Sequence, residues 1–396
     1  MQPFEGVKVI DMTHVLAGPF CAYQLAVMGA DVIKVEAPDE RDMSRDSGGA
    51  VAALNRRHMG LGFMAQASNK RALTLNLKSE KGSEILKRLA AISDVLIENY
   101  RTGALARLGL GYEDLSKLNP RLIYCSMTGY GQNGPKAGHA AYDNVIQAIS
   151  GLMEVNVQDG MEPLKVGPPV LDYGAGIMAA FAIASALYQR SRTDRGQHID
   201  VSMFDSALLL MSSTVVDFLN GGGPTQRMGN DSAYSGYACY PTKDGLLMIG
   251  AWTPKQHARM WRALGRPDLA NGGDYEEMEA RKEQESSVLR QILKARTADE
   301  WETHLNAAGV PAERVRTLED ALAHPQLEHR GVLHTHEDVP GAGGPLTVPV
   351  AAFGYAHGGP AVRTPPPQHG AHTDEVLSEL GFDGEAIAGL RREGVV

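Results

Sequence analysis

Short apolar runs alternate with amphipathic segments through the first 125 residues of the chain. Runs of strand length, bounded by polar or turn-forming residues, lie at 7–11, 31–36, 70–76, 94–98 and 121–126. Segments with helical periodicity lie between them, at 19–29, 79–91 and 103–108. Strands that alternate with helices form a parallel sheet covered on both faces, and ligands of such sheets bind at the carboxyl ends of the strands.

The same pattern continues to about residue 220, where a Gly-Gly-Gly-Pro linker ends it. It adds a long helix to residue 189, a strand at 196–203 and an apolar helix at 205–219. These segments predict a large α/β domain over 1–220 with a parallel, Rossmann-like sheet.

The pattern of hydrophobic and polar residues changes after the linker. A hairpin is expected around 243–245, where Asp-Gly favours a tight turn, and charged amphipathic helices follow it. We therefore expect a smaller α+β domain over 225–330. The last segment, 331–396, is apolar enough to return to the large domain.

The composition narrows the class of protein. The chain has 396 residues, enough for two domains, and its 43% hydrophobic and 21% charged residues are typical of a soluble globular protein. A net charge of −9 argues against nucleic acid and anionic membranes as partners. We find no signal peptide, no apolar run of about 18 residues, and only three widely separated cysteines. We expect a cytoplasmic protein without a disulfide framework or a metal site.

Asp172 is the most suggestive single residue, because it lies between an apolar run and a small-residue helix that we expect to begin after Gly174. A helix N-terminus attracts negative charge, and Gly174 and Gly176 would let a substrate approach the backbone. A carboxylate held next to an activated acyl group in a dry site is a nucleophile. The alternative is that Asp172 only caps the helix, which is the commonest role for aspartate at that place.

Residues 129–134 read Gly-Tyr-Gly-Gln-Asn-Gly and follow a strand, so a dinucleotide fingerprint with Glu154 as its acidic residue must be weighed. Pro135 and the polar residues after it do not continue into the required helix. We therefore favour a mobile glycine lid over a site. His139, beside this lid, is either an acid/base group or a bystander.

Basic residues at strand ends suggest contacts to a phosphate-bearing ligand, although ordinary surface charge is the alternative. They are Lys34, Arg41, Arg45, Lys70, Arg71, Lys78, Arg101 and Arg107.

Nine short motifs, in order and with compatible gaps, carry a family resemblance. They are Leu-Ala-Gly-Pro at 16–19, Gly-Ala-Asp-Val-Ile-Lys-Val-Glu at 29–36, Asp-Met-Ser-Arg at 42–45, Asn-Lys-Arg at 69–71, Glu-Asn-Tyr at 98–100, Gly-Leu-Gly-Tyr at 109–112, Gly-Tyr-Gly-Gln at 129–132, His-Thr at 372–373 and Gly-Val-Val at 394–396. Together they resemble the class III (CaiB/BaiF-type) CoA-transferases, a family that also contains α-methylacyl-CoA racemase.

The resemblance implies an aspartate nucleophile at Asp172, which would form an aspartyl anhydride and then an aspartyl-CoA thioester. It implies coenzyme A as co-substrate and no permanently bound cofactor or metal. It implies a homodimer of two interlocked chains. The lid residues carried over from it are Gly129, Gly131, Gln132 and Tyr142, and His139 joins them because it lies beside the glycine lid. The CoA-binding residues carried over from it are Val15, Ala17, Leu75, Lys78, Asn99, Tyr100, Arg107 and Leu108.

The subclass depends on residues 142–145, which read Tyr-Asp-Asn-Val. The racemase branch has a His-Asp pair here, and tyrosine, with a pKa near 10, is a poor base at neutral pH. The pattern resembles the transferase branch, closest to enzymes that move CoA from succinyl-CoA to a small carboxylate or dicarboxylate. A 2-methylacyl-CoA racemase or epimerase and a CoA-binding protein without turnover stay open as alternatives. Acceptor choice would depend on side chains such as Arg227 or His139.

Overall fold

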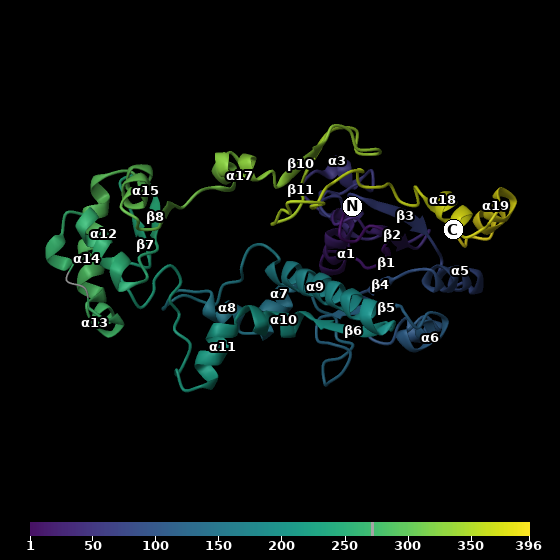
Figure 1. Ribbon diagram of the computed structural model, residues 1–396, viewed down its shortest axis with the longest axis horizontal. Helices are drawn as coiled ribbons and strands as arrows, with labels where there is room; N and C mark the ends of the chain where they lie inside the picture. The colour runs from purple at the N-terminus through teal and green to yellow at the C-terminus, as the bar shows by residue number, and fades with distance from the viewer. Residues whose placement is uncertain (271–272) are drawn as a thin grey trace. The chain divides into compact units, whose positions relative to one another are not determined.

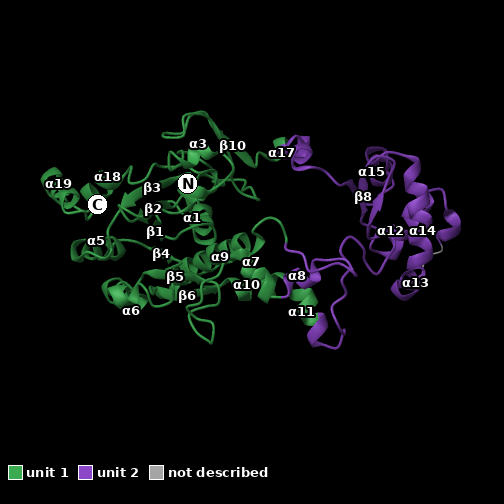
Figure 2. Ribbon diagram, turned by 180° about the vertical axis from the view of Figure 1, so that it is seen from behind, with its two compact units in different colours: residues 1–150, 166–216, 328–396 green, residues 151–165, 217–327 purple. Residues whose placement is uncertain are grey.

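The computed structural model describes residues 1–270 and 273–396, which form two compact units (Figures 1 and 2). Unit 1 consists of residues 1–150, 166–216 and 328–396, and unit 2 consists of residues 151–165 and 217–327. The segment 151–165, which the sequence analysis left in the large domain, belongs to unit 2. Arg227 forms an ion pair with Glu154, and Gln158 pairs with Met228 in an isolated bridge. These contacts between residues far apart in sequence cannot be read from a local pattern.

Unit 1 contains a six-stranded sheet in which every neighbouring pair is parallel, so the predicted parallel sheet is confirmed. Its strands are β1 (Lys8–Met12), β2 (Asp31–Glu36), β3 (Lys70–Thr74), β4 (Val95–Glu98), β5 (Ile123–Thr128) and β6 (Gln197–Ser202). They lie in the order β3-β2-β1-β4-β5-β6. In this doubly wound order, successive strands are added on one side of β1 up to β3 and on its other side from β4 onward. Ligands of such sheets bind at the carboxyl ends of the strands beside this switch between β1 and β4.

Helices of unit 1 join and cover the strands (Figure 1). The longer ones are α1 (Ala17–Val27), α5 (Glu80–Ala91), α6 (Tyr112–Leu118), α7 (Asp143–Ile149), α9 (Val170–Thr193) and α10 (Met203–Leu210). The shorter ones are α2 (Ser44–Ser47), α3 (Ala52–Asn55), α4 (Leu61–Met64) and the 3₁₀ turn η1 (Ala106–Leu108). Helix α11 (Ser212–Leu219) and helix α17 (Pro325–Arg330) cross the two unit boundaries.

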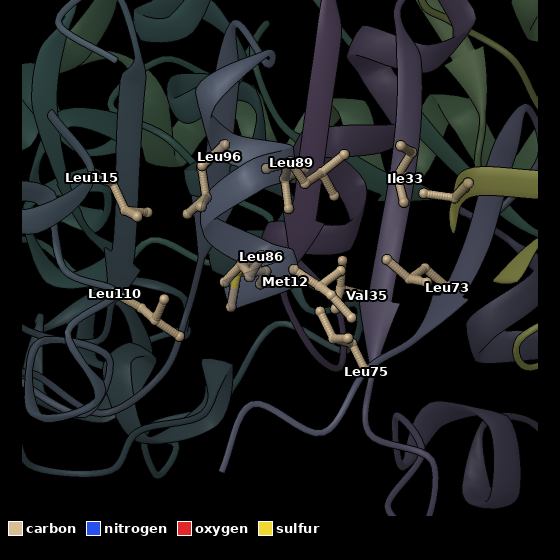
Figure 3. Close-up of a cluster of buried hydrophobic side chains, with 14 of the residues drawn as sticks. Met12, Ile33, Val35, Leu73, Leu75, Leu86, Leu89, Leu96, Leu110 and Leu115 are labelled. Carbon is tan, nitrogen blue, oxygen red and sulfur yellow. The ribbon is translucent and has the colours of Figure 1, made fainter. Parts of the chain in front are cut away.

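One hydrophobic core lies between the sheet and helices α5 and α6 (Figure 3). Met12, Ile33 and Leu73 reach it from three strands, and Leu86 and Leu89 reach it from α5. Helix α5 forms here because Ser79 caps it by accepting a hydrogen bond from the Gly82 amide, while its apolar residues recur on one face. This core stabilises the sheet that carries the candidate site.

Helix α9 begins at Val170, so the expectation that it starts after Gly174 is wrong. Both glycines lie inside the helix, and each faces a neighbouring helix closely. A Cβ on Gly174 would be 2.8 Å from the Leu210 side chain, and one on Gly176 would be 2.8 Å from the Ala17 carbonyl oxygen. Their low helix propensity is outweighed by this close packing against α10 and α1.

Helix α9 is also long and apolar enough, by length and composition alone, to cross a membrane, which the sequence analysis did not expect. Core helices of water-soluble proteins pass the same test. In unit 1 the helix packs along α1 and against β5 and β6, with Ala175, Ala179 and Ile183 fully buried. Burial of this face accounts for part of its apolar composition.

Unit 2 has a three-stranded antiparallel sheet and its own core around Trp261 and Trp301. The strands are β7 (Cys239–Pro241), β8 (Leu246–Ile249) and β9 (Ala312–Arg314). The helices are α8 (Leu152–Val155), α12 (Pro254–Ala263), η2 (Pro267–Leu269), α13 (Tyr275–Ala280), α14 (Lys282–Ile292), η3 (Leu293–Ala295), α15 (Ala298–Ala307) and α16 (Leu318–Leu322). Strands β7 and β8 are antiparallel neighbours, with Pro241 opposite Leu246 and residues 242–245 in the turn between them, which confirms the predicted hairpin.

The C-terminal segment packs on unit 1. It contains the antiparallel pair β10 (Leu333–His336) and β11 (Leu346–Pro349), then α18 (Thr373–Glu379) and α19 (Gly384–Arg392). The His372 amide donates to the Ala72 carbonyl oxygen of β3, and Thr373 Oγ1 accepts from the Thr74 amide. The exposed edge of β3 is thereby closed by the tail.

Candidate active site

A pocket of about 280 Å³ lies in unit 1 at the carboxyl edge of the sheet. It is lined by residues 14–17 after β1, 99–102 after β4, 127–129 at the end of β5, and 138–142, together with Asp172 and Met203. The pocket therefore sits beside the point where the strand order reverses, as the parallel-sheet pattern predicted. Asp172 is its only carboxylate side chain among the described lining residues.

Asp172 lies in the first turn of α9 and is partly buried. Its side chain makes no capping hydrogen bond, because the N-cap residue is Pro169, so the capping interpretation is wrong for this residue. Burial, and secondarily the negative charge of Asp143, raise the pKa of the Asp172 carboxyl to about 7. These two effects outweigh the attraction of the helix N-terminus for a negative charge.

Asp143, which is far from α9 in sequence, caps the N-terminus of that helix. Its Oδ2 accepts hydrogen bonds from the amides of Leu171 at 2.7 Å and Asp172 at 3.2 Å, and its Oδ1 accepts from Gln147 Nε2. Asp143 is itself buried in the first turn of α7. It therefore both fixes the helix that carries Asp172 and holds a negative charge beside it. Sequence reasoning missed this role, because no local signal links residues 28 positions apart.

Asn99 and Tyr100, two of the predicted CoA-binding residues, line the pocket, and both contact His14. Asn99 Oδ1 accepts from the His14 amide at 2.8 Å, and its Nδ2 donates to the His14 carbonyl oxygen at 2.9 Å. The Tyr100 ring meets the His14 ring edge-on at 5.0 Å. The amide group of Asn99 thus holds the loop after β1, where Val15 and Ala17 also line the pocket.

The predicted lid residues divide into two groups. Gly129, His139 and Tyr142 line the pocket, and Tyr142 is exposed. Gly131 and Gln132 do not line it. Gly131 has φ of 85°, a conformation that suits glycine, and the Gln132 amide donates to Asp200 Oδ2 at 2.9 Å.

Four predicted CoA-binding residues lie outside the pocket. Leu75 directly follows β3 and its side chain belongs to the hydrophobic core (Figure 3), so it can offer a ligand only backbone atoms. Lys78 is exposed after the same strand, and Arg107 and Leu108 are exposed in η1 after β4. These four residues follow the same edge of the sheet as the pocket.

The strand-end basic residues do not act as one phosphate-binding group, which corrects the expectation. Lys34, Lys70 and Arg45 are buried and form internal ion pairs with Asp42, Asp11 and Glu36 respectively. A buried charge without a partner would cost several kcal/mol, so these three side chains serve the fold and are not available to bind phosphate.

The other basic residues are at the surface or half-buried. Arg71 pairs with Asp31, Glu375 and Glu379, and Arg41 pairs with Asp46. Lys78, Arg101 and Arg107 are exposed and carry no ion pair within the described part of the chain. Only these three stay available to a phosphate group.

A family model, CoA-transferase family III, matches residues 4–373. The chain belongs to this family. It is 35% identical to the succinyl-CoA:glutarate CoA-transferase of Mus musculus, over 100% of this chain and 91% of that protein. It is 34% identical to the succinate–glutarate CoA-transferase of Agrobacterium fabrum, over 96% of each chain. A solved CAIB/BAIF family protein from Brucella suis is 31% identical and superposes with a TM-score of 0.80, over 96% of this chain and 99% of that one. The protein is thus an enzyme, a class III CoA-transferase.

Proposed function

We propose that this enzyme moves CoA from an acyl-CoA donor, succinyl-CoA first among the candidates, to a small carboxylate or dicarboxylate. The observation that carries the proposal is the position of Asp172, the one carboxylate among the described lining residues of a pocket at the reversal point of the strand order. The named activities of the relatives from Mus musculus and Agrobacterium fabrum support the choice of succinyl-CoA and a dicarboxylate. No feature of the pocket favours the racemase or the non-catalytic alternative.

The first half of the reaction would load CoA onto Asp172. The carboxylate attacks the thioester carbonyl of the donor, the C–S bond breaks, and CoA leaves as a thiolate, which gives a mixed anhydride. The thiolate then attacks the aspartyl carbonyl of this anhydride. The anhydride C–O bond breaks, the donor leaves as a free carboxylate, and an aspartyl-CoA thioester is formed.

The second half reverses these steps with the acceptor. Its carboxylate attacks the aspartyl thioester and releases the thiolate, and a second anhydride forms. Attack of the thiolate on the acceptor's acyl carbonyl yields the new acyl-CoA and restores the carboxylate of Asp172. No electron or proton is consumed over the cycle.

The environment of Asp172 suits a nucleophile of this kind. A carboxylate with a pKa of about 7 is ionised in a substantial fraction of molecules at neutral pH and is more basic than a solvated one. Burial raises the free energy of the ionised carboxylate. This cost disappears when the carboxylate becomes part of a neutral anhydride or thioester. The ground state is thereby destabilised relative to the acylated intermediates.

The pocket alone is too small for a whole CoA ester, because sites for drug-sized ligands occupy about 300–1,000 Å³. We propose that it holds the thioester end. The remainder of CoA would then follow the carboxyl edge of the sheet toward Lys78, Arg107 and Leu108, which are exposed there. Backbone atoms of Leu75 would lie on the same path.

The second carboxylate of a dicarboxylate acceptor needs a cationic or hydrogen-bonding partner. We propose His139 for this role, because it lines the pocket and is exposed. Arg227 is the weaker candidate, because its guanidinium donates to the Met161 carbonyl oxygen and to Glu154.

We also propose that the enzyme is a homodimer, as the family resemblance implied, and that it is cytoplasmic, as the sequence analysis expected. Support comes from one face of α9, where Ile177, Phe181 and Tyr188 are 50%, 69% and 68% exposed. Ile177 and Phe181 also line an apolar groove of about 790 Å³ in unit 1, which has no charged side chain among its described lining residues. Apolar surface of this extent is characteristic of an interface. Sedimentation analysis of the purified enzyme tests the proposal, and a monomer at micromolar concentration would contradict it.

The chemical proposal is tested by intact-mass analysis after mixing the enzyme with a panel of acyl-CoA thioesters and trapping with hydroxylamine or borohydride. We expect an adduct that is located on Asp172 and absent from Asp172→Ala. Asp374→Ala is the matched control, because Asp374 also lies in the first turn of a unit 1 helix but is exposed and paired with Arg391. The proposal fails if no thioester gives an adduct and no exchange between thioester and free acid is detected.

A further inference from the structure

The loop between β1 and α1, residues 13–16, has an unusual backbone. Val15 has φ of 70°, in the left-handed region. A β-branched residue is a genuine outlier there, because its Cβ substituents crowd the backbone. Such a conformation persists only where the surroundings impose it, and it is found most often at functional sites. Val15 and its neighbours line the pocket that contains Asp172.

Buried charges hold the first part of this loop. Lys34 Nζ donates to the Thr13 carbonyl oxygen at 2.7 Å and to Asp42 Oδ2 at 3.1 Å. The Asp42 carboxylate accepts from the Val15 amide, at 3.2 Å and 3.3 Å to its two oxygens. Both charged side chains are 1% exposed. The ion pair therefore spans the loop from the peptide before His14 to the strained residue.

Two neutral side chains complete the arrangement. Asn99 bonds both the amide and the carbonyl group of His14, and Gln66 Nε2 donates to the Val15 carbonyl oxygen at 2.8 Å. Every backbone polar group from the Thr13 carbonyl to the Val15 carbonyl thus has a side-chain partner. Helical or sheet hydrogen bonds would not require side chains, so this loop is defined by the residues that surround it.

The loop is also fixed relative to the helix that carries Asp172. Gly176, one turn beyond Asp172, approaches the Ala17 carbonyl oxygen so closely that a Cβ would be 2.8 Å away. A Cβ on Gly18 would be only 2.4 Å from the Thr13 Cβ. A shift of the loop would therefore alter a wall of the pocket that contains the Asp172 carboxylate, where the thioester must be oriented for attack.

We propose that Lys34 and Asp42 are positioning residues for CoA transfer: their buried ion pair holds Val15 in its left-handed conformation and so shapes the wall of the Asp172 pocket. The inference rests on the proposed function and adds to it two residues that do not touch the substrate. Asp42 is well placed for the task, because its carboxylate also accepts from the Ser44 amide at 3.0 Å and the Ser44 hydroxyl at 2.7 Å, which fix its orientation. Burial opposes ionisation of Asp42, but Lys34 and these hydrogen bonds hold its pKa well below the usual range.

The competing explanation is that the pair only stabilises unit 1. The double variant Lys34→Met/Asp42→Leu separates the two, because replacing both partners with apolar residues leaves no unpaired buried charge and retains much of the stability. Leu115→Ala, in the core between the sheet and α6, is the control for stability loss without a change near the pocket. Asp42→Asn serves as a second variant, which keeps an acceptor for the Val15 amide but loses the charge.

Three quantities are measured for each variant: the unfolding midpoint, kcat and KM for an acyl-CoA donor, and hydrogen–deuterium exchange of peptides covering residues 13–18. We expect the double variant to fold, to exchange these amides at least tenfold faster, and to lose at least tenfold in kcat with less than a threefold change in KM. Leu115→Ala should retain kcat within twofold. We expect Asp42→Asn to lose at least tenfold in kcat and to exchange the amides of residues 13–18 at least tenfold faster, with less than a threefold change in KM.

A double variant with wild-type kcat, or unchanged exchange over residues 13–18, overturns the inference. So does an equal loss of kcat in Leu115→Ala. If the double variant does not fold, Asp42→Asn decides the question with the same readouts. If the wild-type enzyme forms no adduct on Asp172, the proposed function fails. The exchange measurement, which needs no turnover, still tests whether the ion pair holds the loop.

Discussion

Replacing Asp172 by asparagine should abolish CoA transfer and at the same time stabilise unit 1 at neutral and alkaline pH. The carboxyl is partly buried and lies near the negative charge of Asp143, so the ionised form is costly in the folded protein. Asparagine has nearly the same shape and no charge, so it removes that cost. Loss of the nucleophile should lower the transfer rate by at least about a thousandfold.

The magnitude follows from the change in proton affinity. The pKa of the Asp172 carboxyl rises from 3.8 to about 7, and each tenfold change in an equilibrium constant corresponds to about 1.4 kcal/mol. The ionised carboxylate therefore costs at most about 4 kcal/mol. The side chain is partly accessible, so solvent screening reduces this figure, and we expect a gain of about 2 kcal/mol in Asp172→Asn.

The sign of the pH dependence is determined by the raised pKa. Between about pH 4 and pH 7 the folded protein holds a proton on Asp172 that the unfolded chain has lost, so the wild-type free energy of unfolding falls as pH rises. Asparagine does not titrate. The advantage of the variant should therefore be near zero at pH 4, grow through this window, and be constant above it.

Urea denaturation at pH 5 and pH 8, followed by far-ultraviolet circular dichroism, measures the effect. All three tryptophans lie in unit 2, so their fluorescence would not report on unit 1. Asp374→Asn is the matched control and should give no gain. The reasoning is refuted if Asp172→Asn is no more stable than wild type at pH 8, or if its advantage is the same at both pH values.

Three further outcomes are expected. Asp143→Asn removes the second cause of the raised pKa of the nucleophile, so the acid limb of the kcat/KM profile should move to lower pH, by less than about one pH unit; a move to higher pH would contradict this. Gly176→Ala places a Cβ 2.8 Å from a carbonyl oxygen of α1 and should lower the free energy of unfolding by about 1–3 kcal/mol in urea denaturation. Gly389→Ala in α19 is the control, because its Cβ meets only one side-chain atom, at 3.8 Å, and it should raise the free energy of unfolding by up to about 1 kcal/mol. Lys70→Met leaves the buried Asp11 carboxylate without its ion-pair partner and should lower the free energy of unfolding by about 3–5 kcal/mol. Lys81→Met breaks an exposed ion pair and should lower it by less than about 1 kcal/mol. Equal losses would show that burial does not decide the energetics of these pairs.

Much of the architecture could be predicted from local pattern. All six strands of the sheet of unit 1 overlap the predicted strand segments, and the central strands β1, β4 and β5 do so because strands buried on both faces are nearly continuous runs of apolar residues. The hairpin at 243–245 followed from Asp-Gly alone. The family could also be predicted, because many short motifs in fixed order are more specific than any one of them. Local pattern was least reliable at Gly174 and Gly176, where helix propensity predicted a later start than packing allows.

The sequence by itself therefore determined the elements, the family and the candidate nucleophile, since each depends on residues near one another in the chain. The tertiary structure decided which charges are available for chemistry. The sequence analysis grouped Lys34 and Lys70 with Lys78 as candidate phosphate ligands, yet Lys34 and Lys70 lie within strands and are buried against Asp42 and Asp11, and only Lys78 is exposed. The fate of a charged side chain depends on its partner and its burial, and both come from segments distant in sequence. For the same reason only the fold could show Asp143 capping α9, and Val15 held in a strained conformation beside Asp172.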